Sequence, residues 1–349
     1  MLASTSAVLV REAVDRLGRS ELELQELFHE VSARVRRVVP HDGSVWLTFD
    51  PDTLLPTSTL EWEQPPDMVR ALWRNELLTN DLNGRAELVK MPVPVAALSQ
   101  HDEAALESSE RVQRILRPAG LGDELRAVLR VGGTTCGGFV LHRELGGGPF
   151  IAEERAFIAD IARDVADGLR RSLVRRPATE NAASVLVPGV ATVTEDGELI
   201  STTAEARRLL RLMPSNNTTT LAGAAMESTR KREGARCRVR LPDGRWLLLH
   251  GAPLDGDGEH ATDVAVTLLP APIPDVTSLL LRLHGLTARE RQVAERLMHG
   301  LTTDEIAARL YISPHTLRDH TKAVFQKVGV RSRSELMALA ADPLAAATS

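Results

Sequence analysis

Apolar residues recur every three to four positions along two long stretches in the first half of the chain, 20–39 and 152–175. This period matches an α-helix with one buried face, so each stretch is predicted to be an amphipathic helix. Ser20 and Glu23 have the spacing of a capping box, which predicts that the first of these helices starts at Ser20. Weaker helical patterns cover 66–78 and 107–117.

Short runs of apolar and β-branched residues lie between these helices. They predict strands at 44–49, 55–60, 125–131 and 134–142. Gly132-Gly133 separates the last two runs, and because glycine adopts positive φ at little cost, this dipeptide predicts a tight β-hairpin. Helices, strands, hairpin and closing helix together predict an α+β sheet domain over residues 1–176, with flanking helices.

A second and smaller sheet domain is predicted over residues 184–269. Its strands are expected at 190–194, 198–201, 236–241, 245–250 and 263–269. Thr202 and Glu205 have capping-box spacing, so a helix is expected to separate the first two strands from the last three. The next segment, 270–282, begins with three alternating prolines and is predicted to be a semi-rigid linker.

Helix signals are densest in residues 283–341. Three pairs have capping-box spacing: Thr287 with Glu290, Thr302 with Glu305, and Ser332 with Glu335. Ser313 before Pro314 marks another helix start, because proline is well tolerated at the first helical position. Gly300 and Gly329 are placed to end helices. The sequence therefore predicts an all-α domain of four helices, the second and third joined by a tight turn.

The second and third of these helices have the pattern of a helix-turn-helix. A tight turn holds the two helices at a steep angle, so the second can enter the major groove of B-DNA, which is ~12 Å wide. The outward positions of this helix are rich in hydrogen-bond donors. The predicted DNA-contacting residues are Ser313, His315, Thr316, Arg318, Asp319, Lys322, Gln326 and Lys327. Asp319 is expected either to accept from a cytosine amino group or to pair with Lys322.

Charge is unevenly distributed along the chain. The whole chain has a formal charge of −5, yet residues 283–341 hold nine Lys and Arg against six Asp and Glu. A basic segment on an acidic body favours phosphate contact by the C-terminal part alone.

Five blocks of the C-terminal segment resemble the LuxR-type helix-turn-helix family of transcription regulators. They are Leu286–Val293, Thr303–Ala307, Leu310–Ser313, Thr316–His320 and Lys327–Val330. The resemblance implies that Arg318, Asp319 and Lys322 read a double-stranded DNA operator, with Thr316 near the backbone. It also implies a homodimer with the fourth helix at the dimer contact, and it allows RNA polymerase as a further partner.

The two sheet domains resemble families of sensor domains. The element order over 20–175 is similar to that of GAF domains, which bind small molecules. The sequence VATVTEDGELISTTAEARRLL, residues 190–210, resembles the opening hairpin and helix of a PAS domain. No cofactor is predicted, but the GAF resemblance leaves room for an unidentified small-molecule ligand. Trp46, Trp62 and Trp73 are expected to pack in a core or to line such a pocket.

Other classes of function are not indicated. The sequence shows no nucleophile–base–acid set, no P-loop and no HExxH motif, so no catalytic residues are predicted. Cys136 and Cys237 are isolated, which argues against a zinc site and fits a reducing cytoplasm. The apolar runs are shorter than the ~20 residues of a membrane span, and no secretory signal is evident.

The sequence therefore predicts a cytoplasmic one-component transcription regulator. Two sensor domains would adjust the DNA affinity of the C-terminal domain. The N-terminal region could instead be a protein-interaction module without a small ligand, or an enzyme domain.

Overall fold

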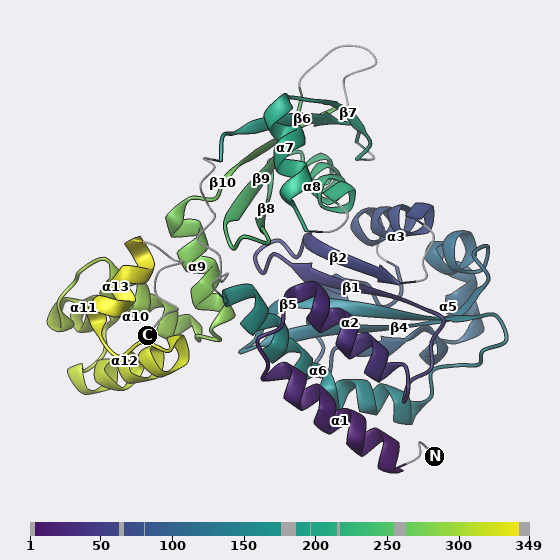
Figure 1. The fold of residues 1–349 in the computed structure, drawn as a ribbon, viewed down its shortest axis with the longest axis horizontal. Helices are drawn as coiled ribbons and strands as arrows, with labels where there is room; N and C mark the ends of the chain where they lie inside the picture. The colour runs from purple at the N-terminus through teal and green to yellow at the C-terminus, as the bar shows by residue number, and fades with distance from the viewer. Residues whose placement is uncertain are drawn as a thin grey trace.

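The computed structural model describes residues 4–62, 66–79, 81–175, 186–195, 197–214, 217–254 and 263–341. The chain has a mixed α/β structure with two antiparallel sheets and a C-terminal helical domain (Figure 1). Among the described residues, every helix is too short or too polar to serve as a bilayer-spanning segment.

The first sheet contains the strands predicted in the N-terminal region and one more. Its strands are β1 (Gly43–Phe49), β2 (Pro56–Trp62), β3 (Val95–Ala97), β4 (Leu121–Val131) and β5 (Thr134–Glu144), in the order β2-β1-β5-β4-β3. The predicted hairpin joins β4 to β5, and Gly132 and Gly133 adopt φ of 55° and 83°. The positive-φ turn expected from the Gly-Gly dipeptide is therefore present.

Helices cover both faces of this sheet. They are α1 (Ser4–Gly18), α2 (Leu24–Val35), α3 (Pro66–Leu78), α4 (Arg85–Leu88), α5 (Glu103–Ser108) and α6 (Ala152–Val174). Figure 1 shows α1, α2 and α6 on one face and α3 on the other. Alternation along β1 follows from this arrangement: Trp46 stacks on Phe139 at 4.2 Å between ring centroids, whereas Leu47 and Phe49 point toward α3.

Two details of these helices differ from the prediction. Ser20 does not cap α2: its hydroxyl donates to the Leu17 carbonyl at the end of α1, and α2 begins only at Leu24. The helix expected over 107–117 is interrupted, because the Ser109 hydroxyl and the Arg111 amide both donate to Asp81. Contacts with a distant carboxylate thus override local helical spacing.

The second sheet repeats the strand order of the first. Its strands are β6 (Gly189–Val193), β7 (Leu199–Thr202), β8 (Ala235–Arg240), β9 (Trp246–Pro253) and β10 (Val264–Pro270), in the order β7-β6-β10-β9-β8. Its helices are α7 (Ala204–Leu212) and α8 (Asn217–Lys231). The cap of α7 is Thr203, whose hydroxyl accepts from the Ala206 amide at 3.2 Å, and not Thr202 as predicted. Thr202 ends β7, so the helix starts one residue later.

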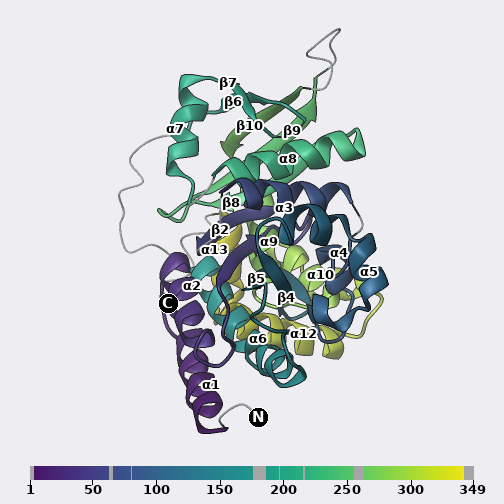
Figure 2. The same cartoon turned by 90° about the vertical axis from the view of Figure 1, so that its right-hand side faces the viewer.

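Helix α8 joins the two sheet domains. It packs on β8, β9 and β10 of its own sheet and also on β2 and α3 of the first domain (Figure 2). Its Met226 shares one apolar cluster with Phe49 and Trp73 of the first domain. The two domains therefore meet through a continuous core. Of the three tryptophans expected in a core or a pocket, Trp46 and Trp73 are buried, and the side chain of Trp62 lies outside the described residues.

The segment expected to be a linker, 270–282, is mostly helical. Pro270 ends β10, and α9 (Ile273–Leu283) follows at once. Proline lacks the N–H that the first turn leaves unpaired, so the proline run starts this helix instead of preventing it. Leu279, Leu280 and Leu283 pack into the core of the first domain, whereas Leu281 packs into the C-terminal domain.

Candidate nucleic-acid interface

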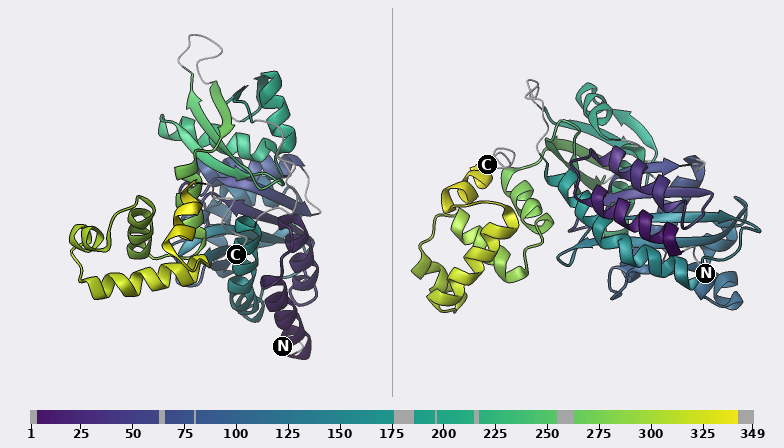
Figure 3. Two further views of the ribbon diagram at one scale, coloured as in Figure 1. Left: turned by 60° about the vertical axis from the view of Figure 1, so that its left-hand side comes forward. Right: turned by 60° about the horizontal axis from the view of Figure 1, so that its bottom comes forward.

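The C-terminal domain consists of the four predicted helices. They are α10 (Ala288–Met298), α11 (Thr303–Leu310), α12 (Pro314–Val328) and α13 (Arg333–Ala341). Figures 1 and 3 show them as a separate lobe joined to the rest of the molecule through α9, with α12 along one edge of the lobe.

The helix caps form as the sequence predicts. Thr287 with Glu290 and Thr302 with Glu305 make reciprocal capping boxes. The Ser313 hydroxyl accepts from the Thr316 amide at 3.1 Å, and the Ser332 hydroxyl accepts from the Glu335 amide at 3.1 Å. Removing one such cap costs about 1 kcal/mol, so the four caps fix the helix boundaries by local interactions alone.

The inner faces of the helices build a small apolar core that orients α12. Leu317 and Val324 of α12 are buried against α10 and α11. Ala307 of α11 is 5% exposed, and its small side chain permits the close approach of α11 and α12. The turn between these helices passes through Tyr311, which has left-handed backbone dihedrals and a 95% exposed side chain. Local sequence signals predicted the turn but not this exposed tyrosine.

The outward face of α12 carries most of the predicted DNA-contacting residues. All eight are exposed: Ser313, His315, Thr316, Arg318, Asp319, Lys322, Gln326 and Lys327. At 3.6 residues per turn, His315, Lys322 and Gln326 project from the side opposite Leu317 and Val324. Arg318 flanks this stripe. The helix therefore presents a cationic and amide-bearing face on the side away from the core of its own domain.

Asp319 pairs with a residue other than Lys322, the partner within the chain that its spacing suggested. Its Oδ2 lies 3.3 Å from His315 Nδ1, one helical turn earlier, instead of pairing with Lys322. Both side chains of this pair are more than two-thirds exposed. Lys322 consequently has no partner in the described part of the chain that would hold it away from a bound duplex.

Lys327 differs from the other predicted DNA-contacting residues because its side chain is paired with a residue of another helix of the domain. Its ammonium group lies 2.7 and 2.9 Å from the two carboxylate oxygens of Glu290 and 3.4 Å from the Gly285 carbonyl. Position 327 lies on the flank of α12 that faces α10, so the side chain links two helices of the domain. Lys327 therefore stabilises the domain, and its contact with DNA stays a prediction.

Glu290 is the acidic partner of this link. Burial alone would raise the pKa of its carboxyl group, but hydrogen bonds from Lys327 and from the Thr287 backbone outweigh burial and lower that pKa. A lowered folded-state pKa contributes stability above the unfolded value, about 4.3, and this contribution is lost as the pH falls through the folded value.

A substitution of Glu290 tests this dependence of stability on pH. At pH 7, Glu290→Gln is expected to lower the stability of the chain by about 1 kcal/mol, because Lys327 is partly exposed and the pair is screened. The difference from wild type should shrink below about pH 4, where the carboxyl group becomes protonated. Thermal unfolding from pH 3 to 7 measures it. Lys327→Met removes the same pair from the other side and should show the same pH profile; a constant difference at every pH contradicts the assignment.

Two short helices joined by a tight turn, the second with an exposed polar face, define this domain as a helix-turn-helix. Residues 284–340 match the family model described as "Bacterial regulatory proteins, luxR family". The chain is 50% identical to spore germination protein GerE of Bacillus subtilis over 50 residues, which are 14% of this chain and 68% of GerE. The chain belongs to the LuxR family of bacterial regulatory proteins.

One other relative is matched over a smaller share of its length. Transcriptional regulatory protein UhpA of Escherichia coli is 45% identical over 65 residues, 18% of this chain and 33% of UhpA. The chain thus spans about a third of that relative. Among solved structures, it is similar to Escherichia coli SdiA at 12% identity, over 96% of both chains, with a TM-score of 0.39. A score at this level does not establish a common fold.

Proposed function

We propose that the chain is a one-component transcription regulator that places α12 in the major groove of an operator. The observation that carries this proposal is the exposed polar face of α12 in a LuxR-family domain. Arg318 and Lys322 are the principal donors to base edges or phosphates. The surface is completed by Ser313, His315, Thr316, Asp319, Gln326 and Lys327. In this proposal two copies bind, with α13 at the dimer contact, where Met337 is 40% exposed.

The two sheet domains are proposed as the sensor region, the first GAF-like over 1–176 and the second PAS-like over 184–269. Support comes from the order of helices and strands in each domain and from the common strand order of the two sheets. A signal can change DNA affinity only if it binds the DNA-competent and DNA-incompetent arrangements unequally. Helix α9 is the element that would transmit such a difference, since it packs on both the first domain and the C-terminal domain.

Single substitutions on α12 test the proposal. We expect Arg318→Ala and Lys322→Ala each to weaken operator binding by about 1–3 kcal/mol for a base contact, with reduced discrimination between sequences. A phosphate contact would instead weaken binding to all sequences and flatten the salt dependence. The duplex is first selected from a randomised library with the wild-type chain, and affinities are then measured by fluorescence anisotropy at several salt concentrations.

Arg296→Ala is the matched control. It removes the same charge from α10, where Arg296 donates to the Gln292 carbonyl of its own helix. Its binding is expected to stay within twofold of wild type. Wild-type affinity in both α12 variants, or no duplex selected at all, would refute the proposed DNA-binding face.

A further inference from the structure

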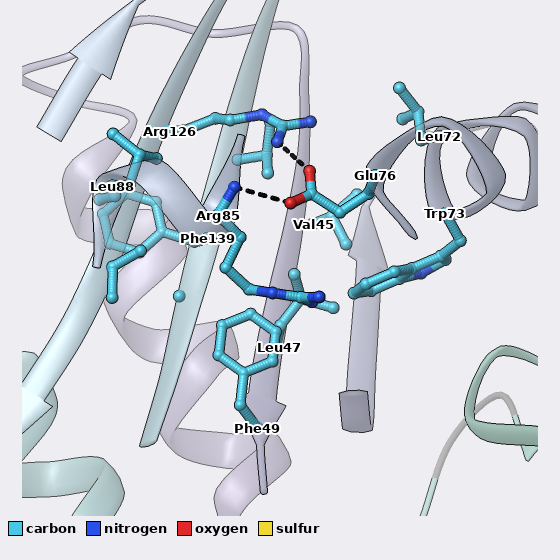
Figure 4. Close-up of a pocket in the computed structure, with 14 residues that line it drawn as sticks. Val45, Leu47, Phe49, Leu72, Trp73, Glu76, Arg85, Leu88, Arg126 and Phe139 are labelled. Atoms are coloured by element: carbon cyan, nitrogen blue, oxygen red, sulfur yellow. Dashed lines mark hydrogen bonds and ion pairs between the residues drawn. The ribbon is translucent and has the colours of Figure 1, made fainter. Parts of the chain in front are cut away.

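A cavity lies in the first domain between the sheet and helices α3 and α4, on the face opposite α6 (Figure 4). Its volume is about 60 Å³, and its walls are mainly apolar, with Leu47, Phe49, Trp73 and Leu88 among them. A water molecule needs roughly 10–15 Å³ of such space, so the cavity has room for a group of a few non-hydrogen atoms.

One basic side chain in this apolar cavity, Arg85, has a buried nitrogen without a hydrogen-bond partner among the described residues. The guanidinium carbon of Arg85 lies 5.0 Å from the centroid of the Phe49 ring and 5.4 Å from that of Trp73. Figure 4 shows the guanidinium group between the two rings. Its Nη1 is buried and has no hydrogen-bond partner among the described residues. Burial lowers the pKa of Arg85, and the charges of Glu76 and Glu227 oppose that shift only in part.

The nearest carboxylate, that of Glu76, forms its hydrogen bonds with groups other than this guanidinium. One oxygen of Glu76 accepts from the Arg85 backbone amide at 2.7 Å, and the other accepts from the Arg126 side chain. The dashed lines in Figure 4 mark both interactions. Glu76 therefore fixes the start of α4 and pairs with Arg126, while the charged end of Arg85 extends past it into the cavity.

The other acidic groups close to the cavity are also engaged. Glu124 pairs with Arg111 and Arg126, at 3.1 and 2.8 Å. Asp81 accepts hydrogen bonds from two side chains and two backbone amides, and Glu227 of α8 pairs with two basic residues of its own helix. Among the described side chains, none of these carboxylates accepts a hydrogen bond from the Arg85 guanidinium, which faces the cavity.

We propose that this cavity binds a small organic monocarboxylate, with the acid group on Arg85 and the apolar part against Leu47 and Leu88. An arginine fork matches the planar carboxylate and forms strong charge-assisted hydrogen bonds, which become stronger where water is excluded. The volume and the apolar walls favour a short aliphatic or single-ring acid over a nucleotide or a hydrated inorganic anion. This inference rests on the sensor role proposed for the first domain and specifies the class of signal.

The cavity walls connect directly to the neighbouring domains. Phe49 is followed in the chain by Asp50, which binds Arg238 of the second domain. Trp73 belongs to α3, which packs on α8. A carboxylate that draws the Arg85 guanidinium from between Phe49 and Trp73 would therefore change the packing of both interdomain contacts.

The test is calorimetric titration of the full chain, without DNA, with butanoate and benzoate and with their neutral amides, butanamide and benzamide. We expect at least one acid to bind and its amide to bind at least tenfold more weakly. Arg85→Met, which removes the charge and keeps most of the volume, should weaken acid binding at least tenfold. Arg130→Met, a control on β4 whose guanidinium donates to the Met91 and Pro92 carbonyls, should bind as wild type does.

Thermal unfolding separates a lost site from a lost fold. Without ligand, Arg85→Met is expected to melt at or above the wild-type temperature, because it removes a buried charge whose Nη1 has no hydrogen-bond partner among the described residues. Failure of both acids to bind wild type at 10 mM, or equal binding by acid and amide, overturns the proposal. Wild-type affinity for the acids in Arg85→Met would also overturn the proposal. Since no DNA is present, these outcomes are independent of the DNA-binding test.

Discussion

Replacing Asp50 by alanine is expected to lower the free energy of unfolding by about 3–5 kcal/mol, because it leaves the charge of Arg238 buried without its main partner. Asp50 is 2% exposed and accepts three hydrogen bonds from Arg238: from the backbone amide at 2.8 Å, from Nε at 2.8 Å and from Nη2 at 2.7 Å. The two residues lie in different domains, in the turn after β1 and in β8. Urea unfolding followed by tryptophan fluorescence measures the change.

Asp52 provides the matched control. It contacts the same Arg238 and also Arg282 of α9, both at 2.5 Å, but its side chain is 36% exposed. Asp52→Ala is expected to cost about 1 kcal/mol or less, as for other partly exposed ion pairs. The double variant Asp50→Leu/Arg238→Leu should recover much of the loss, since it removes both buried charges. Equal effects of Asp50→Ala and Asp52→Ala would contradict the importance given to burial.

The sequence was sufficient to predict those features that depend on residues close together in the chain. The four caps of the C-terminal domain and the Gly132-Gly133 hairpin each involve groups at most three or four positions apart, and all are present. The outward face of α12 follows from helical periodicity in the same way. The pairing of Lys327 does not follow from this periodicity, because its partner Glu290 is 37 positions away and no local pattern marks that pair.

The sequence was insufficient to predict those features that depend on contacts between distant parts of the chain. Asp81 interrupts the helix predicted over 107–117 by binding Ser109, 28 positions away. The alternating prolines of 270–282 suggested a linker, and only the packing of the following leucines on two domains shows that a helix follows. The buried charges around Arg85 come from three separate parts of the first domain, so their proximity requires the folded sheet.

The C-terminal domain is docked on the first domain by a close approach of two backbones. The turn of the β4–β5 hairpin touches Gly285, which follows α9 and precedes α10. His284 beside it is enclosed: burial, reinforced by the charge of Arg170 of α6, lowers its pKa to about 4, so the imidazole is neutral at pH 7. The C-terminal domain is thus held at the turn of the β4–β5 hairpin. The same sheet lines the Arg85 cavity.

Adding one methyl group at this contact should release the lobe. In Gly132→Ala the new Cβ would lie 2.6 Å from Gly285 Cα and 2.8 Å from the Gly285 carbonyl oxygen, so one backbone must move. We expect amide hydrogen exchange at Gly285 and Leu286 to accelerate at least tenfold, which corresponds to about 1.4 kcal/mol of lost docking free energy. If docking sets the orientation of α12, operator affinity should change in the same variant.

Gly133→Ala separates the contact from the strain of the turn. Gly133 also has positive φ, so alanine there costs a similar 1–2 kcal/mol or so, but a Cβ at this position meets no atom within 4 Å. Exchange at Gly285 should therefore stay at the wild-type rate in Gly133→Ala, although the hairpin itself is strained. If both variants accelerate exchange equally, distortion of the hairpin and not contact with Gly285 is the cause, and the docking point proposed for the DNA-binding lobe is wrong.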